Sequence, residues 1–492
     1  MNISEIFKLD VSQQELDFID IDLEIDYPLF IDPFLISNQK NNWVMEADLL
    51  IKNFFNEFKI NIIERKYEYA VEMLSFMSEP KETCLGLSKS GTMHGRGVGI
   101  INSTSIVDKI VSTKAIQKGI VNNIEDLMIF VDDIDKDKIS DMVTNIIRGK
   151  LIEYTQQQCN LWGIKLTKGE TLPFWDAVDK EWIYTDSEIL IVNGREIILV
   201  PKFIVSPISV FTAQSYNWFF IVEQERNFHL QRRSSIVKMK KLKNGTEKYT
   251  LSKKDTQEFI KEHDIKENSS YKSYIRDYTL RYPELFEEFV KYSKRVSKPI
   301  SNDEIIKFCD SQNQSDLIDY LIEKLENIPT GRNDATRYHH LVKSLLEVIF
   351  YPELINPIIE REIHDGRKRI DIVMDNNANK GFFEKLNSVS KIFSPYIYIE
   401  CKNYETDIKN PELDQLAGRF SDKRGRFGLL LCRNISDVNT FKARCKDTYN
   451  DGRGLIIGLT DNDIVRMLEY VKDDNRLGID KILEDNKRDI MI

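Results

Sequence analysis

The chain has 492 residues and a formal net charge of −10, from 79 acidic and 69 basic side chains. A chain of this length is expected to form two or three domains rather than one. Its acidic balance argues against a histone-like protein that binds nucleic acid indiscriminately, but it leaves room for a basic surface gathered in one place.

The sequence carries no signal for a membrane or for secretion. It has no run of about eighteen apolar residues, and its first residues have neither the basic nor the apolar region of a signal peptide. The six cysteines are scattered and form no CxxC pair. This distribution argues against a structural zinc site and a disulfide framework, and it suits a reducing compartment. We therefore expect a cytoplasmic protein that has no membrane partner.

The sequence of residues 1–206 predicts an α+β domain. We recognise no family in it, and we expect it to have a role in recognition or regulation. Residues 19–26 alternate between apolar and acidic side chains, which is typical of a strand with one buried and one solvated face. A long helix is expected over 140–161. Asn193 and Gly194 separate two apolar runs and predict a tight hairpin turn.

A glycine-rich segment at residues 86–99 invites comparison with phosphate-binding loops. Such a loop needs Gly, four residues and then Gly-Lys-Ser/Thr, and here Gly91 is followed by Thr92. We therefore expect a surface loop rather than a nucleotide site.

Residues 207–330 form a second segment, which is basic and aromatic at first and then helical. Between residues 226 and 254, ten basic side chains are set against one acidic side chain, Glu247. Basic residues interleaved with aromatic rings suit phosphate neutralisation and base stacking. A solvated basic linker fits the pattern equally well. The candidates for nucleic-acid contact in this segment are Arg232, Arg233, Lys240 and Lys241.

The third domain, residues 331–492, follows a turn-rich boundary and contains the stretch Tyr-Ile-Tyr-Ile-Glu-Cys-Lys at 396–402. Its apolar and aromatic residues predict a strand. Side chains alternate along a strand, so Glu400 and Lys402 are expected on one face while Cys401 points to the other. A carboxylate and an ammonium beside a buried face cost free energy unless the pair does chemistry or binds a charged ligand. A surface salt bridge is the alternative.

Two predicted elements upstream bring further acidic side chains to this strand. A hairpin is expected with strands at 357–363 and 368–374, the second of which carries Asp371. Before it, the apolar spacing over 337–350 predicts a helix. The polar face of that helix is formed by three residues spaced three and four apart: His340, Lys343 and Glu347.

Downstream of the strand, a helix is expected at 410–420, with Gln415 on it, and buried strands at 425–432 and 454–459. The order of a helix with an acid, a hairpin with Asp371 and a strand ending in Glu-Cys-Lys resembles the PD-(D/E)xK nuclease superfamily. The whole order is most similar to Mrr-type restriction endonucleases and Holliday-junction resolvases.

This resemblance covers the C-terminal domain only. It implies a restriction-endonuclease-like αβββαβα core there, within a multidomain chain of α/β and α+β class. The sequence departs from the family at Ile370, which stands where the signature has proline, and in a polar insertion at 376–394.

The resemblance also implies roles for individual residues. Four ligands for Mg²⁺ or Mn²⁺, ions that prefer oxygen donors, are Asp371, Glu400, the backbone carbonyl of Cys401, and Glu347. Lys402 would orient the attacking water or stabilise the transition state. Gln415 would support the site or contact a phosphate. His340 and Lys343 are either contacts for the substrate backbone or part of a solvated face.

We therefore expect a metal-dependent endonuclease that hydrolyses phosphodiester bonds, with DNA as the favoured substrate and RNA left open. By analogy, a large unfamiliar module joined to such a nuclease suggests restriction or anti-phage defence. Two alternatives stay open: a nuclease-fold sensor or scaffold with regulated or vestigial activity, and a structure-selective repair or recombination nuclease. Cutting both strands of a duplex usually needs two sites, so we expect a homodimer or larger homo-oligomer. The first 330 residues leave room for a regulatory protein partner.

Overall fold

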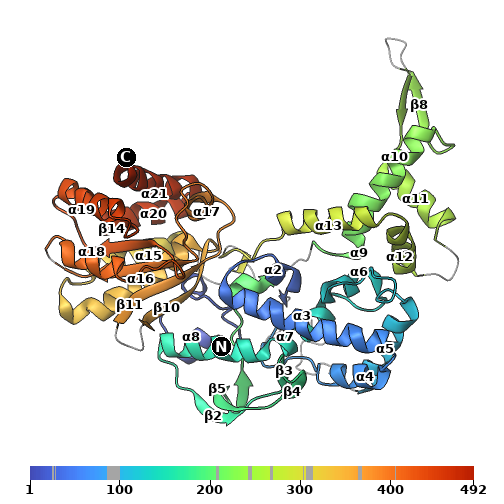
Figure 1. The fold of residues 1–492 in the computed structure, drawn as a ribbon, viewed down its shortest axis with the longest axis horizontal. Coiled ribbons are helices and arrows are strands. Elements are labelled where there is room, and N and C mark those ends of the chain that lie inside the picture. Colours follow the sequence, from blue (N-terminus) through green and yellow to red (C-terminus); the bar gives the residue numbers. More distant parts are fainter. Residues whose placement is uncertain are drawn as a thin grey trace.

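Buried apolar side chains gather into two clusters in the computed structural model, which describes residues 1–24, 27, 29–85, 100–206, 210–241, 247–265, 270–302, 304–305, 314–363, 368–404 and 406–492. The first cluster runs from Ile3 to Ile305 and takes in Tyr351 and Ile355. The second runs from Ile318 to Ile490. Figure 1 shows the second part around a sheet at the C-terminal end of the chain, beside the largely helical first part.

A five-stranded sheet forms the centre of the second cluster, in the spatial order β10-β11-β12-β13-β14. The strands β10, β11 and β12 are antiparallel neighbours, whereas β12, β13 and β14 run parallel. Parallel strands are usually covered on both faces, which is why the Phe-Gly-Leu-Leu-Leu-Cys sequence of β13 is apolar throughout and buried. The strands are β10 (Leu354–Ile363), β11 (Lys368–Asn376), β12 (Tyr396–Lys402), β13 (Phe427–Cys432) and β14 (Leu455–Thr460).

Helices cover this sheet. α16 packs on β10, β11 and β12, and α18 packs on β12, β13 and β14. α15 packs against α16 and α20, so its apolar side chains belong to the second cluster. The helices are α15 (Gln314–Asn327), α16 (Ala335–Phe350), α17 (Gly381–Ser388), α18 (Asn410–Ala417), α19 (Val438–Asn450), α20 (Asp461–Lys472) and α21 (Arg476–Met491).

The elements predicted for residues 337–460 are confirmed, with small differences at their ends. The predicted hairpin turn at 364–367 lies outside the described residues. The polar insertion at 376–394 contains α17, whose Phe382 and Phe383 join the second cluster.

The first cluster combines helices with three small sheets. Its helices before residue 206 are α1 (Ile3–Ile6), α2 (Pro33–Ser37), α3 (Asn42–Ile63), α4 (Tyr67–Ser75), α5 (Ile100–Thr113), α6 (Leu127–Phe130), α7 (Lys136–Ile146) and α8 (Arg148–Trp162), with short 3₁₀ turns η1 (Gln13–Glu15), η2 (Ile124–Asp126) and η3 (Lys202–Ile204). The sheets pair β1 (Phe30–Ile31) with β7 (Val205–Ser206), β3 (Phe174–Asp176) with β4 (Glu181–Ile183), and β5 (Asp186–Val192) with both β2 (Thr167–Glu170) and β6 (Arg195–Ile197).

Sequence predictions for this part are confirmed at the hairpin and corrected elsewhere. Asn193 and Gly194 have φ of 51° and 76°, as a two-residue hairpin turn between β5 and β6 requires. The helix expected over 140–161 is two helices, α7 and α8, and the glycine-rich segment at 86–99 lies outside the described residues.

The alternating segment at 19–26 is not the predicted strand with a solvated acidic face. Its described residues make only an isolated bridge, between Asn2 and Asp22. Asp20 is 3% exposed and accepts hydrogen bonds from the backbone nitrogen and hydroxyl of Ser4, at 2.9 and 2.5 Å. α1 folds back over this carboxylate, so both faces of the segment are partly enclosed.

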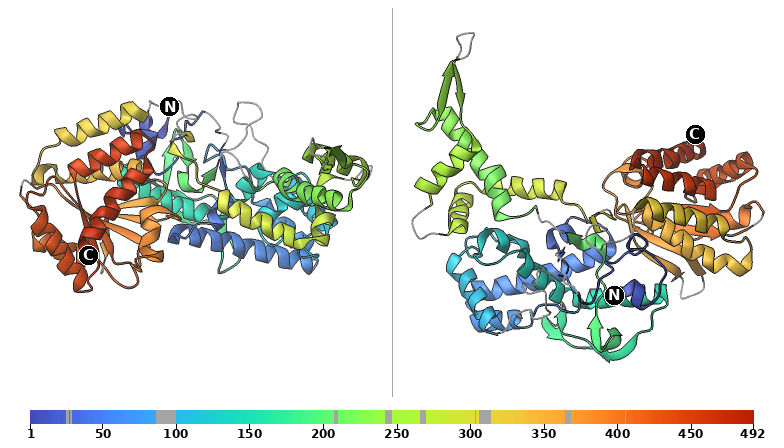
Figure 2. Two further views of the ribbon diagram at one scale, coloured as in Figure 1. Left: turned by 90° about the horizontal axis from the view of Figure 1, so that it is seen from above. Right: turned by 180° about the vertical axis from the view of Figure 1, so that it is seen from behind.

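Residues 210–305 extend the first part into an arm. Figures 1 and 2 show the two-stranded ribbon β8–β9 projecting from it, at the opposite end of the molecule from the five-stranded sheet. The elements are α9 (Ala213–Tyr216), a π-helical turn η4 (Asn217–Ile221), α10 (Val222–Arg232), β8 (Lys238–Lys241), β9 (Glu247–Thr250), α11 (Lys253–His263), α12 (Tyr271–Arg281) and α13 (Pro283–Val296).

Candidate functional site

Asp371 and Glu400 lie next to each other across two antiparallel strands. Ile372 of β11 pairs with Ile399 of β12, so Asp371 and Glu400 are the next cross-strand neighbours and their side chains share a face. The backbone nitrogen of Cys401 donates a hydrogen bond to Asp371 Oδ2 at 2.9 Å. The sequence therefore brings these two carboxylates together through strand register alone.

One carboxylate oxygen of Glu400 accepts hydrogen bonds from two side chains, a charged lysine and a neutral glutamine. Lys402 Nζ, two residues along the same face of β12, donates to Glu400 Oε1 at 2.8 Å, and Gln415 Nε2 of α18 donates to the same oxygen. Lys402 also donates to Gln415 Oε1 at 3.3 Å, which closes a triangle of contacts. Glu400 is fully buried, and its second oxygen, Oε2, is a buried atom with no hydrogen-bond partner among the described residues. One oxygen of this carboxylate thus accepts two hydrogen bonds, and the other accepts none from the described residues.

Burial and neighbouring charge set the protonation of this pair. Burial, followed by the charge of Asp371, raises the pKa of Glu400 above its ordinary value. Burial alone would lower the pKa of Lys402, but the carboxylate of Glu400 outweighs it and the pKa is raised. Lys402 therefore stays an ammonium at neutral pH.

The first turns of α16 reach this site and contribute His339. Its Nε2 lies 3.8 Å from Asp371 Oδ2. The placement follows from Asn403, directly after β12, whose Nδ2 donates to the carbonyls of Pro329 and Gly331 at 2.9 and 3.0 Å. These bonds fasten the segment before α16 to the end of β12, so the helix begins beside the carboxylates.

The structure does not bring Glu347 to this pair. It lies eight residues beyond His339 on α16, which is about 12 Å along a helix axis. Glu347 is fully buried, with Oε1 at 3.4 Å from Nζ of Lys202, which is also fully buried. Lys202 belongs to the first part of the chain, so the acidic side chain of α16 is used at the contact between the two parts.

Lys343 lies in the same buried contact and is not a surface residue. It is 1% exposed, and its Nζ donates to the backbone carbonyl of Glu15 at 2.7 Å. Burial lowers the pKa of Lys343 to about 8. This contradicts both expectations for Lys343, a substrate contact and a solvated face, because residues around η1 cover this side of α16. His340 is half-buried on the same helix.

Asp17 completes this interdomain cluster, which we define as Asp17, Lys202, Lys343 and Glu347. The hydroxyl of Tyr154 donates to Asp17 Oδ2 at 2.8 Å, and the backbone nitrogen of Asn356 in β10 donates to Oδ1 at 3.3 Å. Burial and the charge of Glu347 raise the pKa of Asp17 well above its ordinary value.

The four candidates for nucleic-acid contact in the basic segment are all exposed, and they belong to the arm, whereas Asp371 belongs to β11 of the five-stranded sheet at the other end of the molecule (Figure 1). The guanidinium of Arg233 lies 4.5 Å from the centre of the Tyr249 ring, and that of Arg232 lies 5.7 Å from the Phe228 ring. Lys240 and Lys241 are adjacent residues of β8.

Sequence reasoning missed His339 and Arg419. The apolar spacing of α16 predicts which residues share a face of the helix, but it does not predict which turn lies beside the sheet. The sequence therefore gives no reason to choose His339 over His340 as the neighbour of Asp371. Arg419 follows α18, is 7% exposed, and contributes positive charge at Glu400, which lowers the pKa of that carboxyl against the larger effect of burial. Its Nε is a buried atom that makes no hydrogen bond to any residue the structure describes. A lone arginine after a helix carries no pattern that could have marked it.

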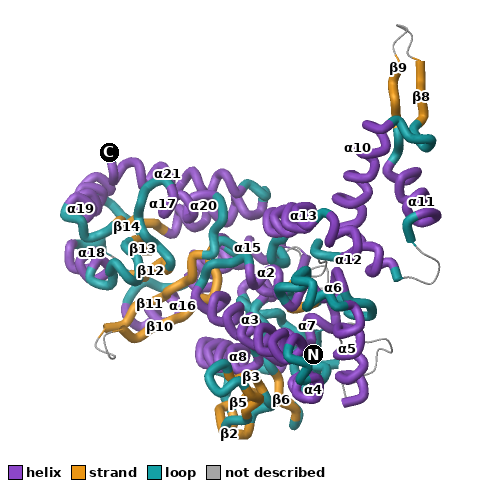
Figure 3. Tube along the Cα trace, turned by 45° about the vertical axis from the view of Figure 1, so that its right-hand side comes forward, coloured by secondary structure: helices purple, strands orange, loops and turns teal. Residues whose placement is uncertain are grey.

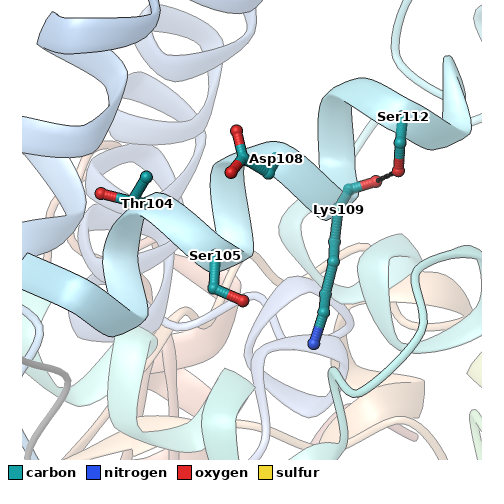
Figure 4. A pocket seen from close by; sticks show the side chains of 5 residues that line it. All are labelled: Thr104, Ser105, Asp108, Lys109 and Ser112. Carbon is teal, nitrogen blue, oxygen red and sulfur yellow. Dashed lines mark hydrogen bonds between the residues drawn. The ribbon is translucent and has the colours of Figure 1, made fainter.

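A hollow along α5 lies away from these residues. It is lined by Thr104, Ser105, Asp108, Lys109 and Ser112 (Figure 4). Lys109 is engaged with Asp133, at 2.6 Å. All of the lining side chains among the described residues come from one helix, α5.

The residues around Asp371 fit a hard cation with few protein ligands. Two carboxylates lie side by side, and the unpartnered Oε2 of Glu400 is an oxygen donor of the kind that Mg²⁺ and Mn²⁺ prefer. Within the described part of the chain, no group of three or more His, Cys, Asp or Glu side chains is arranged to hold a metal ion. Any ion here would therefore depend on backbone oxygen and solvent for the rest of its shell.

Comparison with known proteins adds a family match only in the first part. The profile of a family described as a domain of unknown function (DUF8370) matches residues 8–212. No curated protein matches the chain, and no solved structure matches it. In the described residues, no helix is long and apolar enough to cross a membrane.

Proposed function

We propose that this chain is a metal-dependent endonuclease, with DNA as its favoured substrate, whose C-terminal part has a restriction-endonuclease-like core. The observation that carries the proposal is the placement of Asp371 beside Glu400 across β11 and β12, with Lys402 bonded to Glu400. Two carboxylates next to an ammonium can hold a hard cation and a phosphate in one place. The order α16-β10-β11-α17-β12-α18-β13-α19-β14, in which α17 belongs to the polar insertion, supports the same proposal.

In this proposal the chain positions three kinds of group. Asp371, Glu400 and the backbone carbonyl of Cys401 would hold Mg²⁺ or Mn²⁺. When bound, such an ion supplies an activated water and compensation for phosphate charge. Lys402 brings a positive charge that offsets the negative charge developing on the phosphate. Gln415 fixes the side chains of Glu400 and Lys402, because it bonds to both.

The test is cleavage of supercoiled plasmid with Mg²⁺, with Mn²⁺ and with EDTA. We expect Asp371→Asn and Lys402→Met each to lower the rate about 10²- to 10³-fold, the range found when a group that stabilises developing charge is removed. Asp422→Asn and Lys409→Gln make the same charge changes at exposed positions of this part and should cut at the wild-type rate. Equal activity in the wild type, Asp371→Asn and Lys402→Met would show that these residues are not the cutting site.

One observation favours a second candidate, a nuclease-fold sensor or scaffold. The acid of α16, Glu347, lies in the interdomain cluster, so the described residues bring two acidic side chains, Asp371 and Glu400, to the site. Calorimetric titration of Mn²⁺ separates the candidates. Binding by the wild type that is lost in Asp371→Asn supports the nuclease, whereas a wild type that binds no Mn²⁺ supports the sensor.

A further inference from the structure

The arm formed by α10, the ribbon β8–β9 and α11 sorts its basic side chains into two groups. The first group holds the arm together at its base. Arg226 donates to the backbone carbonyl of Leu251 at 2.7 Å, and Lys253 lies 3.0 Å from Glu223. Lys238 lies 2.9 Å from Asp255 of α11. These cations are already used within the protein.

The second group lies on the strands of the ribbon. In the register of β8 and β9, Lys240 pairs with Lys248, and Lys238 pairs with Thr250. Cross-strand partners share a face, so Lys240 and Lys248 lie on one face of the ribbon, which we call the lysine face. Lys238 lies on the same face, but it is already paired with Asp255. Lys241 pairs with Glu247 on the opposite face. Lys240, Lys241 and Lys248 are all exposed.

The lysine face carries an energetic cost within the free protein. Like charges directly opposite each other on neighbouring strands are destabilising, and Lys240 and Lys248 are such a pair. Among the described residues, no carboxylate forms an ion pair with either of them. A two-stranded ribbon with little apolar burial is also marginally stable by itself. A polyanion against this face would remove the repulsion and stabilise the ribbon.

The other face of the ribbon provides an aromatic and guanidinium surface. Met239 and Tyr249 are cross-strand partners there, and the guanidinium of Arg233 lies over the Tyr249 ring. Met239 is 52% exposed. The major groove of duplex DNA is wide enough to admit a two-stranded ribbon of this kind.

We propose that this ribbon is a DNA-binding arm that docks the lysine face on the backbone of duplex DNA, away from the cutting site. Figures 1 and 3 show the ribbon and the five-stranded sheet at opposite ends of the molecule. A duplex held by the arm therefore meets the protein at a position distinct from the phosphate that would be cut. The choice of DNA as the nucleic acid rests on the proposed function, whereas the binding itself does not require cleavage.

The test measures binding of the full chain to a 30-base-pair duplex, about 100 Å long at ~3.4 Å per base pair, by fluorescence anisotropy in EDTA over a series of salt concentrations. We expect Lys240→Gln/Lys248→Gln to weaken binding about tenfold and to reduce the slope of log affinity against log salt by about 2, one for each lysine that no longer neutralises a phosphate. Lys40→Gln/Lys118→Gln removes the same charge from exposed positions outside the arm and should bind as the wild type does.

A second comparison tests which face of the ribbon binds the duplex. Lys240→Gln and Lys241→Gln are neighbouring substitutions with the same charge change on opposite faces, and only the first is expected to weaken binding clearly. Equal weakening by both, an unchanged slope in the double variant, or equal weakening in the Lys40/Lys118 control would each overturn the proposal. Tighter binding of the wild type to single-stranded RNA than to the duplex would overturn the assignment to duplex DNA.

The binding and cleavage measurements distinguish failure of the arm proposal from failure of the nuclease proposal. If the wild type binds through the lysine face but no metal supports cleavage, the arm stands and the nuclease proposal fails.

Discussion

At the scale of single residues, the environment of each ionisable group decides its chemistry. Glu400 and Lys402 are neighbours along one strand face, yet both are nearly enclosed, at 0% and 8% exposed. An ion pair in such surroundings gains little stability, because the desolvation of two charges offsets their attraction. In the proposed function this pair serves the metal ion and the phosphate, so substitutions of its neighbours should change the cleavage rate.

His339→Asn is predicted to lower plasmid cleavage by about 10- to 100-fold, the range found for groups that orient a ligand-bearing side chain. The reason is that His339 lies against Asp371 and limits its orientation. Arg337→Gln, an exposed change in the same turn of α16, should leave the rate unchanged. A wild-type rate for His339→Asn would show that the proximity of the ring to Asp371 has no functional consequence.

Asp141→Asn is predicted to stabilise the protein, and increasingly so as the pH rises. Burial, together with Asp137 and other acidic neighbours, raises the pKa of Asp141 to about 8. The unfolded chain ionises this group near pH 4, whereas the folded chain holds its proton until about pH 8. Ionisation therefore favours the unfolded state between these values, and the wild type loses stability there as pH rises.

The measurement is the difference in unfolding free energy between Asp141→Asn and the wild type, from urea titrations at pH 5 and pH 8. We expect the difference to be larger at pH 8 by on the order of 1 kcal/mol, since partial solvation of the group reduces the effect. A difference that shrinks with rising pH would contradict the raised pKa.

At the scale of elements, the packing of helices on the five-stranded sheet explains several small residues. Gly458 in β14 lies under Phe441 of α19, and a Cβ there would meet the Phe441 ring at 2.3 Å. Gly428 in β13 lies under Phe420 and Leu416 in the same way, with a Cβ 3.0 Å from the Phe420 ring. Aromatic side chains thus fill the space that these glycines leave on the sheet.

Gly458→Ala is predicted to destabilise the protein by about 1–3 kcal/mol, because the added methyl group forces the Phe441 ring to move in a close-packed layer. Combining it with Phe441→Leu should cost less than the sum of the two single changes, since the smaller side chain makes room for the methyl group. Urea unfolding of the four proteins measures both effects. If the losses in unfolding free energy of the two single variants simply add in the double variant, the destabilisation by Gly458→Ala does not arise from contact with the Phe441 ring.

At the scale of the whole molecule, the interdomain cluster joins the two parts of the chain. Lys202 Nζ lies 3.4 Å from Glu347 of α16 and 4.2 Å from the centre of the Tyr351 ring, with no exposure of either Lys202 or Glu347. Asp17 contacts β10 through Asn356. The two parts are therefore fixed to each other by buried charges, which are costly to separate because each would lose its partner.

Lys202→Met is predicted to destabilise the protein by about 3–5 kcal/mol, because it leaves the buried carboxylates Asp17 and Glu347 with Lys343 as the remaining cation of the interdomain cluster. Lys202→Met/Glu347→Gln should be more stable than Lys202→Met alone, since it restores the balance of buried charges in the cluster. Chemical unfolding measures the coupling. Glu347→Gln by itself should keep at least about half of the wild-type cleavage rate in folded protein, whereas a decrease as large as that of Asp371→Asn would mean that Glu347 acts in the cutting site.

The sequence by itself determined the strands and helices of the C-terminal part, and the pairing of Glu400 with Lys402. Period-2 alternation puts the two on one face, and runs of apolar residues mark the buried parallel strands. It also determined the hairpin at Asn193 and Gly194, because a two-residue turn needs positive φ at both positions. These features depend on local geometry, which residue order specifies directly.

Tertiary structure alone decided how α16 is used. From the sequence, all polar residues of this helix are expected at one site. In the structure, the start of the helix lies beside the carboxylate pair and its later turns contact the first part of the chain. The turn with His339 meets Asp371, while Lys343 and Glu347 meet Glu15 and Lys202, more than a hundred residues away in sequence. Helical periodicity states which residues share a face, and only the packing of distant segments states what each turn of that face contacts.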